Sequence, residues 1–437
     1  MGIRHCRSCH SSSLRVVLDL GAHPLSDALL TSEREAHEQP RYPLRLAFCE
    51  GCSLLQVTET IPPHVLFQRD YPYFSSSSPA LLRHAAANVK RLILDRNLGS
   101  ASFVVEVACN DGYLLRNFVE SGVPCLGIDP AVGPAEQARK IGIPIINDFF
   151  SLTLAEKLAG AGKCADVMIA NNVVAHVDAI NDFVAGFQRL LKPDGLAVLE
   201  CAYAVDMIEN CEFDTIYHEH LFYHTLHGLK PLFERHGLHL NDVEHLPIHG
   251  GSLRVFASRS NRRSTRLEEL MERERELGVH AVDWCTGFSA RIENLRQSLV
   301  ELLEREKTNG ARIACYGAAA KGSTLVNYLD LKPGFFEFVA DANPFKQGRF
   351  MPGQAIPIVH PDRLVEAQPD FALLLVWNFA GEVMRQQAAY RAAGGHFIVP
   401  IPEPCIIEPG EVVNETHFAL TGTSPMPRQA DASVHSG

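Results

Sequence analysis

The segment FDTIYHEHLFYH, residues 213–224, gathers side chains that can move protons. It holds three histidines, one glutamate and two tyrosines between apolar neighbours. Phe222 stands four residues after His218, so the spacing is not the HExxH of a zinc protease. The ordinary pKa of histidine, near 6.5, suits proton removal at neutral pH. We therefore expect a proton-transfer segment, with support of the fold as the alternative role of His218 and His224.

Two CxxC pairs, CRSC and CEGC, stand in the N-terminal part of the chain. They comprise Cys6, Cys9, Cys49 and Cys52. Each pair can place two sulfur atoms on one side of a tight turn, and two pairs form the four-thiolate set that holds Zn²⁺. Because protein ligands would fill all four positions, we expect the metal to be structural. The alternative is four unrelated thiols.

The stretch FVVEVACNDGYLLRNF predicts a buried strand, a tight turn and a helix. Its turn lacks GxGxxG but has an acidic residue, and Gly112 permits a close approach of the backbone to a ligand. Asp129 follows the next strand and can accept both hydroxyls of a ribose. Asp148 and Phe149 fit the edge and face of an adenine. We expect S-adenosylmethionine as cofactor, bound by Glu106, Ala108, Asn110, Asp111, Gly112, Asp129, Pro130, Asp148, Phe149, Asn171 and Asn172.

A second strand–turn–helix pattern begins at ARIACYGAAAKGSTLVNYL, and it is not a P-loop. Small residues at 317–320 let backbone amides face a phosphate at a helix N-terminus, and Lys321 adds positive charge. The alternative is simple packing of a helix on a strand. We expect a substrate site here that also includes the end of a later strand and the PIHGG turn. Its predicted residues are Tyr316, Gly317, Lys321, Ser323, His249, Gly250, Asp341, Trp377 and Asn378.

The elements that position these residues follow from the order of apolar runs and turns. Strands and helices alternate from about residue 79 to 200, which predicts a parallel, doubly wound sheet, and PIHGGSLRVFASR predicts a later antiparallel hairpin. The charged stretch 261–309 predicts solvated connecting helices. We therefore expect an α/β protein with a zinc-binding domain at 1–70, a doubly wound domain at 71–260, a second Rossmann-like α/β domain at 261–410 and a disordered tail at 411–437.

Composition excludes several classes of protein. The net charge of −11 argues against a nucleic-acid binder, and no apolar run approaches the roughly 18 residues of a membrane span. The N-terminus has no apolar signal region, and twelve cysteines over 437 residues do not suggest a disulfide framework. We expect a cytoplasmic protein.

These motifs occur in one order: CxxC…CxxC, DYPYFSSSSP, EVACNDG, ANNVVAHV, FDTIYHEHLFYH, PIHGGSLRV and YGAAAKGSTLVNY. Over roughly residues 5–405 the chain resembles the sugar C-methyltransferases, a family that includes nucleotide-sugar C-3-methyltransferases. The resemblance implies a zinc-binding domain, a class I methyltransferase domain and a C-terminal α/β domain that binds the nucleotide sugar. It also implies a catalytic cluster of Tyr217, Glu219 and His220, with His176 and Tyr71 or Tyr73 nearby.

The resemblance implies methylation of C3 in a 4-keto-6-deoxysugar linked to a nucleotide, with thymidine diphosphate favoured. A ketone beside C3 allows the carbanion to form as an enolate. His220 is the expected base, with Glu219 as an alternative, and Tyr217 and His176 would donate to the enolate. O- or N-methylation of a sugar or another small molecule is one alternative. A non-catalytic zinc-containing binding protein with a methyltransferase fold is another.

Overall fold

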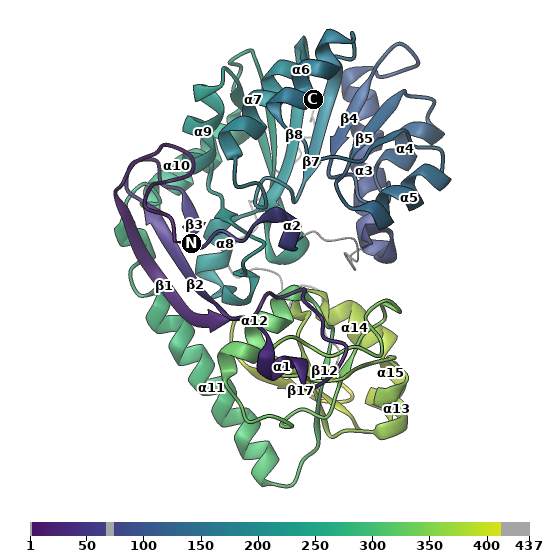
Figure 1. Ribbon diagram of the computed structural model, residues 1–437. Coiled ribbons are helices and arrows are strands. Elements are labelled where there is room, and N and C mark those ends of the chain that lie inside the picture. Colours follow the sequence, from purple (N-terminus) through teal and green to yellow (C-terminus); the bar gives the residue numbers. More distant parts are fainter. Residues whose placement is uncertain (1, 67–73, 412–437) are drawn as a thin grey trace, which may run out of the picture.

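The computed structural model describes residues 2–66 and 74–411 (Figure 1). The predictions for Tyr71, Tyr73 and almost all of the expected disordered tail lie outside these residues. Within the described part of the chain the fold contains three β-sheets, two of them in the α/β domains that the sequence predicted and one in the N-terminal unit. No helix among the described residues is long and apolar enough to cross a membrane.

The N-terminal sheet has four antiparallel strands in the order β1-β2-β3-β9. Its elements are β1 (Leu14–His23), α1 (Glu35–Glu38), β2 (Tyr42–Cys49), β3 (Leu55–Val57), α2 (Pro63–Leu66) and β9 (Phe222–Tyr223). Strand β9 comes from the middle of the chain and pairs with β3 through Tyr223 and Phe222. The sheet that carries the cysteine pairs is therefore completed by the last part of the segment 213–224.

The central sheet has seven strands in the order β10-β11-β8-β7-β4-β5-β6. Its strands are β4 (Val104–Val107), β5 (Cys125–Ile128), β6 (Ile145–Ile146), β7 (Ala165–Asn171), β8 (Leu191–Ala202), β10 (His239–Leu246) and β11 (Ser252–Ser258). The strands from β6 to β8 are parallel, and β10 and β11 form an antiparallel hairpin on the edge of β8. The predicted class I methyltransferase sheet and its later hairpin are both confirmed.

Helices cover both faces of the central sheet. They are α3 (Pro79–Arg96), α4 (Leu115–Glu120), α5 (Val132–Lys140), α6 (Leu152–Gly160), α7 (Ile180–Leu190), α8 (Ala204–Glu209) and α9 (Leu226–Arg235). Apolar side chains of α3, α4 and α5 share one core with Val104 and Val167. Those of α6, α7 and α9 share another with Val105 and Met168. Alternate residues of a strand face opposite sides of the sheet. Because helices cover both sides of this sheet, its fully buried strands consist of continuous apolar runs.

The charged stretch between the two α/β units is less exposed than its composition suggested. It forms α10 (Thr265–Glu276) and α11 (Phe288–Thr308). Helix α11 buries a stripe that shares a core with β1 and the C-terminal sheet, namely Phe288, Ile292, Leu295, Leu299 and Leu303. In α10 the carboxylate of Glu274 is fully buried and accepts hydrogen bonds from the backbone N–H groups of Leu226 and His227. The prediction of simply solvated helices was therefore wrong.

The C-terminal sheet has six strands in the order β14-β13-β12-β15-β16-β17. Its elements are β12 (Ile313–Tyr316), α12 (Ala320–Leu329), β13 (Val339–Ala340), β14 (Ile358–Val359), α13 (Arg363–Ala367), β15 (Phe371–Leu374), α14 (Ala380–Gln386), α15 (Ala388–Ala392), β16 (His396–Val399) and β17 (Cys405–Ile407). All neighbouring pairs are parallel except β16 with β17. The second Rossmann-like unit is confirmed.

The N-terminal unit also touches the C-terminal domain. Figure 1 shows its long purple strands running down one side of the molecule toward α1, which lies beside the C-terminal domain. The Ser323 hydroxyl donates to the Ser26 carbonyl at 2.9 Å, and Leu30 forms a β-bridge with Phe350. The segment after β1 is therefore anchored on the same domain that carries the second glycine turn.

Candidate active site

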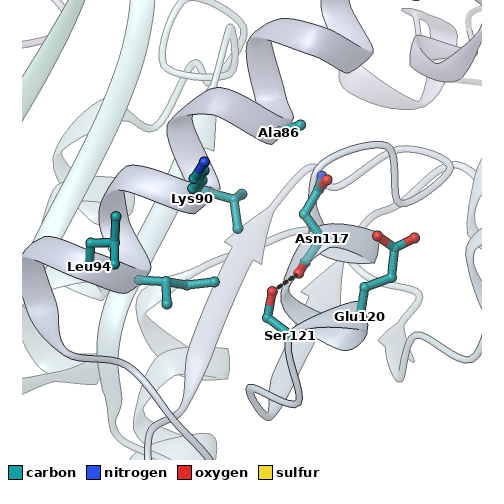
Figure 2. A pocket seen from close by; sticks show the side chains of 8 residues that line it. Ala86, Lys90, Leu94, Asn117, Glu120 and Ser121 are labelled. Atoms are coloured by element: carbon teal, nitrogen blue, oxygen red, sulfur yellow. Dashed lines mark hydrogen bonds between the residues drawn. The ribbon is translucent and has the colours of Figure 1, made fainter.

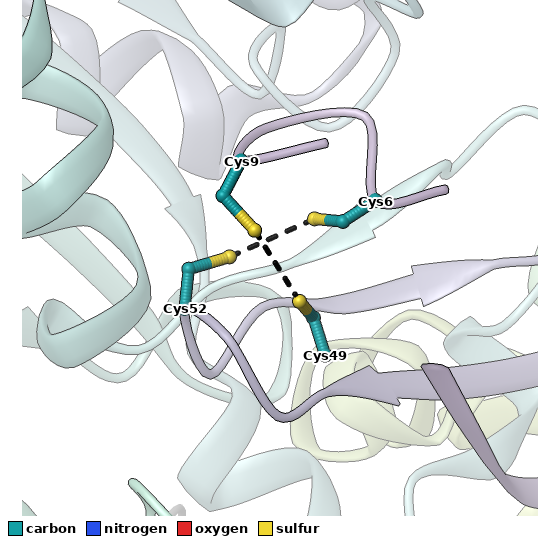
Figure 3. A group of neighbouring side chains, drawn as sticks. All are labelled: Cys6, Cys9, Cys49 and Cys52. Carbon is teal, nitrogen blue, oxygen red and sulfur yellow. Dashed lines mark hydrogen bonds between the residues drawn. The ribbon is translucent and has the colours of Figure 1, made fainter. Parts of the chain in front are cut away.

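The four cysteines of the CxxC pairs meet at one point (Figure 3). Their sulfur atoms all lie within 4.8 Å of one another, with 3.6 Å between Cys6 and Cys52 and 3.5 Å between Cys9 and Cys49. A tetrahedral zinc ion with bonds of about 2.3 Å separates its sulfur ligands by about 3.8 Å. The donor set therefore fits Zn²⁺, with no position left for a substrate.

The four cysteines have polar as well as apolar neighbours. Gln56 Nε2 donates to Cys6 Sγ at 3.2 Å, and this bond favours the thiolate form. Hydrogen bonding from Cys49 and Cys52 lowers the pKa of Cys6. Cys6, Cys49 and Cys52 are buried. The cluster joins the first loop of the chain to the turn between β2 and β3.

The turn after β4 has the backbone expected of a ligand-binding loop. Ala108, Asn110 and Gly112 have φ values of +53°, +51° and +79°. A Cβ atom on Gly112 would lie 2.3 Å from Ile143 Cδ1, so only glycine fits there. Asp129 Oδ2 accepts from Asn110 N at 2.7 Å and its Oδ1 from Ala131 N at 2.8 Å. Burial raises the pKa of Asp129 to about 6.

The segment just before α3 closes against this turn. The backbone N–H of Ser75 donates to Asn110 Oδ1 at 2.9 Å. The Ser76 hydroxyl donates to Asp111 Oδ2 at 2.5 Å. Phe74 stacks on Phe345 of the C-terminal domain with ring centroids 4.9 Å apart. The short serine-rich stretch therefore connects the predicted cofactor loop to the second α/β domain.

The other predicted cofactor residues line the same edge of the central sheet. Glu106 is the last residue but one of β4 and is buried, and burial raises its pKa well above the ordinary value. Pro130 follows Asp129, while Asp148 and Phe149 follow β6 as exposed residues. Asn171 ends β7, and Asn172 follows with φ of +56°. All of these residues lie at the carboxyl ends of parallel strands, where such sheets bind ligands.

Tyr217 and His220 form a direct hydrogen-bonded pair. His220 Nδ1 lies 3.1 Å from the Thr215 carbonyl, which can only accept, so Nδ1 carries the proton. His220 Nε2 is then an acceptor, and the Tyr217 hydroxyl donates to it at 2.7 Å. Burial lowers the pKa of His220 well below 6.5, and the charges of His176 and Lys321 act in the same direction. His220 is therefore neutral at pH 7.

His176 lies beside this pair, with its ring centroid 4.7 Å from that of His220 in a T-shaped contact. Burial lowers the pKa of His176 to about 4, so this ring is also neutral near pH 7. The structure thus brings together His176, Tyr217 and His220, as the sequence predicted for three members of the cluster.

Glu219 differs from its neighbours in protonation. It is 4% exposed, and its Oε2 has no hydrogen-bond partner within the described residues. Burial raises the pKa of Glu219 to about 8, and the charge of Asp27 adds to this shift. Asp27 belongs to the segment after β1, and sequence reasoning missed it because nothing near it in the chain indicates a site. Glu219 is thus mainly protonated at pH 7.

His218 and His224 lie away from the Tyr217–His220 pair. His218 Nε2 lies 3.2 Å from the Pro43 carbonyl, and its ring meets Tyr42 edge-on at 5.9 Å. Both histidines are at most 1% exposed. His218 thus joins the segment 213–224 to β2, a contact that fits the fold-support alternative.

The predicted substrate residues divide into two groups. Lys321 Nζ lies 3.2 Å from Asn378 Oδ1 and 4.2 Å from the centroid of the Trp377 ring. Trp377 Nε1 donates to Asp214 Oδ2 at 2.7 Å. Asp214 and Glu212 are buried acidic residues that sequence reasoning passed over, although Asp214 belongs to the segment 213–224 and Glu212 immediately precedes it. This group lies near the Tyr217–His220 pair, because the charge of Lys321 acts on His220.

The second group supports the turn after β12. Gly317 has φ of +91°, and a Cβ atom there would lie 2.5 Å from Val376 Cγ2. Asp341 Oδ2 accepts from Ala318 N at 2.6 Å. Tyr316 is buried at the end of β12, and the Ser323 hydroxyl bonds to Ser26 rather than facing Lys321.

His249 and Gly250 belong to the PIHGG turn before β11. Gly250 packs directly on Glu212, since a Cβ atom there would lie 2.4 Å from Glu212 Oε2. Burial lowers the pKa of His249 to about 4, and the charge of Lys321 contributes. The turn therefore lies against the carboxylates around Lys321.

Two surface cavities lie elsewhere. One of ≈310 Å³ lies between α3 and the end of α4, where Figure 2 shows Lys90 and Leu94 opposite Asn117 and Glu120. Another of ≈660 Å³ lies between α3, β10 and α10 and contains Arg91, Arg254 and Arg266, all paired with Glu244. Neither lining includes a predicted site residue.

Comparisons with known proteins cover the whole of this architecture. Family models match residues 6–67 ("Putative zinc binding domain"), 78–243 ("Methyltransferase domain") and 247–402 ("C-methyltransferase C-terminal domain"). The C-methyltransferase NovU of Streptomyces niveus is 34% identical over 408 residues, which cover 93% of this chain and 97% of that protein.

More distant matches are limited to the central part. A ubiquinone biosynthesis O-methyltransferase of Bartonella bacilliformis is 30% identical over 97 residues, 21% of this chain and 38% of that protein. The crystal structure of magnesium protoporphyrin IX methyltransferase from Synechocystis PCC 6803 covers 41% of this chain and 79% of that one, with 15% identity and a TM-score of 0.32. From the near full-length match and the three domain models, the chain belongs to the family of S-adenosylmethionine-dependent C-methyltransferases with an N-terminal zinc-binding domain.

Proposed function

We propose that this C-methyltransferase acts on C3 of a 4-keto-6-deoxysugar carried by thymidine diphosphate. The observation that supports this most directly is the orientation of His220. Its Nδ1 proton is fixed by the Thr215 carbonyl, so its Nε2 lone pair points to the hydroxyl of Tyr217. A neutral imidazole with one lone pair directed into the site is the form that a general base needs.

Glu219 and His220 differ in a way that favours His220 as the base. A carboxyl group with a pKa of about 8 holds its proton at pH 7, whereas His220 has none on Nε2. Glu219 is then a hydrogen-bond donor. Tyr217 can transfer its hydrogen bond from His220 Nε2 to the ketone oxygen when substrate binds. Each such donor contributes roughly 3 kcal/mol to stabilising the developing oxyanion.

The reaction then runs in two steps. His220 Nε2 takes the proton from C3, the C–H electron pair becomes the C3–C4 double bond, and negative charge develops on the ketone oxygen. In the second step C3 forms its new bond to the methyl group. S-Adenosylmethionine, held at the turn after β4, would supply the electrophilic methyl and would keep the bonding electrons on its sulfur. Holding both partners in line contributes much of the acceleration.

The remaining assignments follow the same arrangement. The turn after β4 with Asp129 would hold the cofactor, and Asp148 with Phe149 its adenine. His176 would help to hold the ketone. We also propose a cytoplasmic location, since all twelve cysteines are free thiols and four of them fit a zinc site.

Hydrogen exchange at the sugar carbon tests this function. The wild-type protein, with S-adenosylhomocysteine in place of the methyl donor, should wash deuterium from D₂O into C3 of a matching sugar. His220→Ala should keep the affinity for S-adenosylhomocysteine and lose the exchange, whereas the exposed control His360→Ala should keep both. Methylation on oxygen or nitrogen, or full exchange in His220→Ala, would contradict the proposed mechanism.

A further inference from the structure

Helix α12 of the C-terminal domain is attached directly to the reaction segment. The Thr324 hydroxyl donates to the Ile216 carbonyl at 3.0 Å, and Ile216 precedes Tyr217 in the chain. Lys321 lies three residues before Thr324, so both side chains project from the same face of the helix. The helix therefore brings one lysine toward the Tyr217–His220 pair.

Two partners hold the Lys321 ammonium in place. Asn378 Oδ1 accepts from it at 3.2 Å, and the face of Trp377 lies 4.2 Å away. A cation over an indole face is attracted by the ring electrons. Trp377 is itself fixed by its hydrogen bond to Asp214. The position of the charge is therefore determined by packed side chains from two domains.

Two buried carboxyl groups, those of Glu212 and Asp214, lie near this lysine. Glu212 is 3% exposed and Asp214 is 0% exposed, and Asp214 Oδ1 has no hydrogen-bond partner among the described residues. Burial raises the pKa of both, and the charge of Lys321 lowers both. The same lysine lowers the pKa of His220 and of His249. Its charge is thus close to the base as well as to the two carboxylates.

This setting is poorly suited to a diphosphate. The buried carboxyl groups of Glu212 and Asp214 already share the lysine, so its ammonium group is not free to serve the two or more charges of a diphosphate. In the glycine turn, the amides of Gly317 and Ala318 already donate to the Ala340 carbonyl and to Asp341 Oδ2. A ketone oxygen is neutral when it binds and gains charge only during the reaction, so it can approach Lys321 at little cost.

We propose that Lys321 is a catalytic residue whose ammonium group stabilises the enolate oxygen, and that it does not bind the diphosphate of the substrate. This rests on the proposed function, because it needs an enolate. When His220 removes the C3 proton, the carbonyl π electrons move onto the oxygen that faces Lys321 Nζ. When C3 takes the methyl group, the carbonyl re-forms and the charge disappears.

The test separates chemistry from binding in the full-length zinc-loaded protein. Lys321→Met should lower kcat and the rate of deuterium wash-in at saturating sugar on the order of 100-fold. Its Kd for thymidine diphosphate alone should stay within about twofold of the wild-type value. Lys321→Arg, which keeps the charge, should recover part of the loss. The exposed control Lys332→Met should match the wild type in every measurement.

The opposite result overturns the inference. Normal wash-in for Lys321→Met at saturating sugar, with a Kd for thymidine diphosphate raised tenfold or more, would assign Lys321 to the diphosphate. Affinity for S-adenosylhomocysteine and the Tm report whether the variant is folded, and Lys321→Gln, which keeps a polar end for Asn378, replaces it if it is not. Absence of wash-in from the wild type with every sugar would instead contradict the proposed function itself.

Discussion

The turn after β4 and the turn after β12 are built in the same way. In each, an aspartate at the end of the neighbouring strand bonds with both carboxylate oxygens to backbone N–H groups. Asp129 accepts from Asn110 and Ala131, and Asp341 accepts from Ala318 and Asn343. In each turn a glycine with positive φ packs against a branched side chain.

The two turns differ in charge. Near the first stand Glu106 and Asp111, and a single lysine, Lys321, opens the helix after the second. An acidic turn suits the sulfonium and ammonium groups of S-adenosylmethionine, whereas a lysine suits an oxygen that becomes negative. The backbone frame is therefore shared, and the ligand is selected by the few charged side chains placed on it.

The largest effect should come from replacing Asp129 and Asp341, one at a time. Asp129→Ala leaves two backbone N–H groups without their acceptor, at about 1–3 kcal/mol each. We expect its affinity for S-adenosylmethionine to fall about 100-fold by isothermal titration calorimetry. Asp341→Ala removes the equivalent bonds of the other turn and should leave that affinity within about twofold. An equal loss in both variants would mean that the turns are not separate sites.

The glycines of the two turns should respond alike. Gly112→Ala and Gly317→Ala each force a positive φ and a contact of 2.3 Å or 2.5 Å on a side chain. Each should lower the free energy of unfolding by about 1–3 kcal/mol in urea denaturation. Gly142→Ala is the matched control, since its φ is +83° with nothing within 4 Å of the new Cβ atom. If Gly142→Ala costs as much, backbone strain alone explains the effect.

The pH dependence of kcat/KM should be set by Glu219 and by Asp27 of the N-terminal unit, and not by either turn. Glu219 keeps its proton until the pH rises through about 8, so kcat/KM should fall above that value. Asp27→Asn removes a negative charge beside Glu219, which lowers the pKa of Glu219 and moves this limb to lower pH. Glu219→Gln should abolish the limb. Asp111→Asn, at the first turn, should leave the limb where it is.

The smallest effects should come from two exposed phenylalanines, one on each α/β domain. Phe149 is 47% exposed and Phe345 is 58% exposed. Each truncation to alanine should cost binding energy of about 1 kcal/mol. Phe149→Ala should weaken only S-adenosylmethionine and Phe345→Ala only the sugar nucleotide, as measured by separate titrations. If Phe149→Ala weakened only the sugar nucleotide and Phe345→Ala only S-adenosylmethionine, the two ligands would have to be assigned to the opposite domains.

Sequence reasoning identified the elements because the apolar runs and turns are strong local signals. It predicted the two α/β sheets and the cysteine cluster but not the N-terminal sheet, and the family resemblance implied the association of His176, Tyr217 and His220. It did not find Asp27, which reaches Glu219 only through the packing of the N-terminal segment on the C-terminal domain. Nor did it find the pairing of Asp214 with Trp377, 163 residues apart in the chain. The domain boundaries at 70, 260 and 410 stay predictions, as do the roles of the site residues.

Strand β9 has a consequence for how such a protein can be assembled and altered. It follows His220 by two residues and pairs with β3, so that it forms one edge of the sheet that carries the cysteines. During synthesis the zinc-bearing sheet therefore stays incomplete until the ribosome has passed residue 223. For the same reason, a chimera that exchanges only the first 70 residues between relatives would join foreign strands beside His220. A junction after β11, at the exposed residues 260–263, would keep that sheet and its partner strand from one parent.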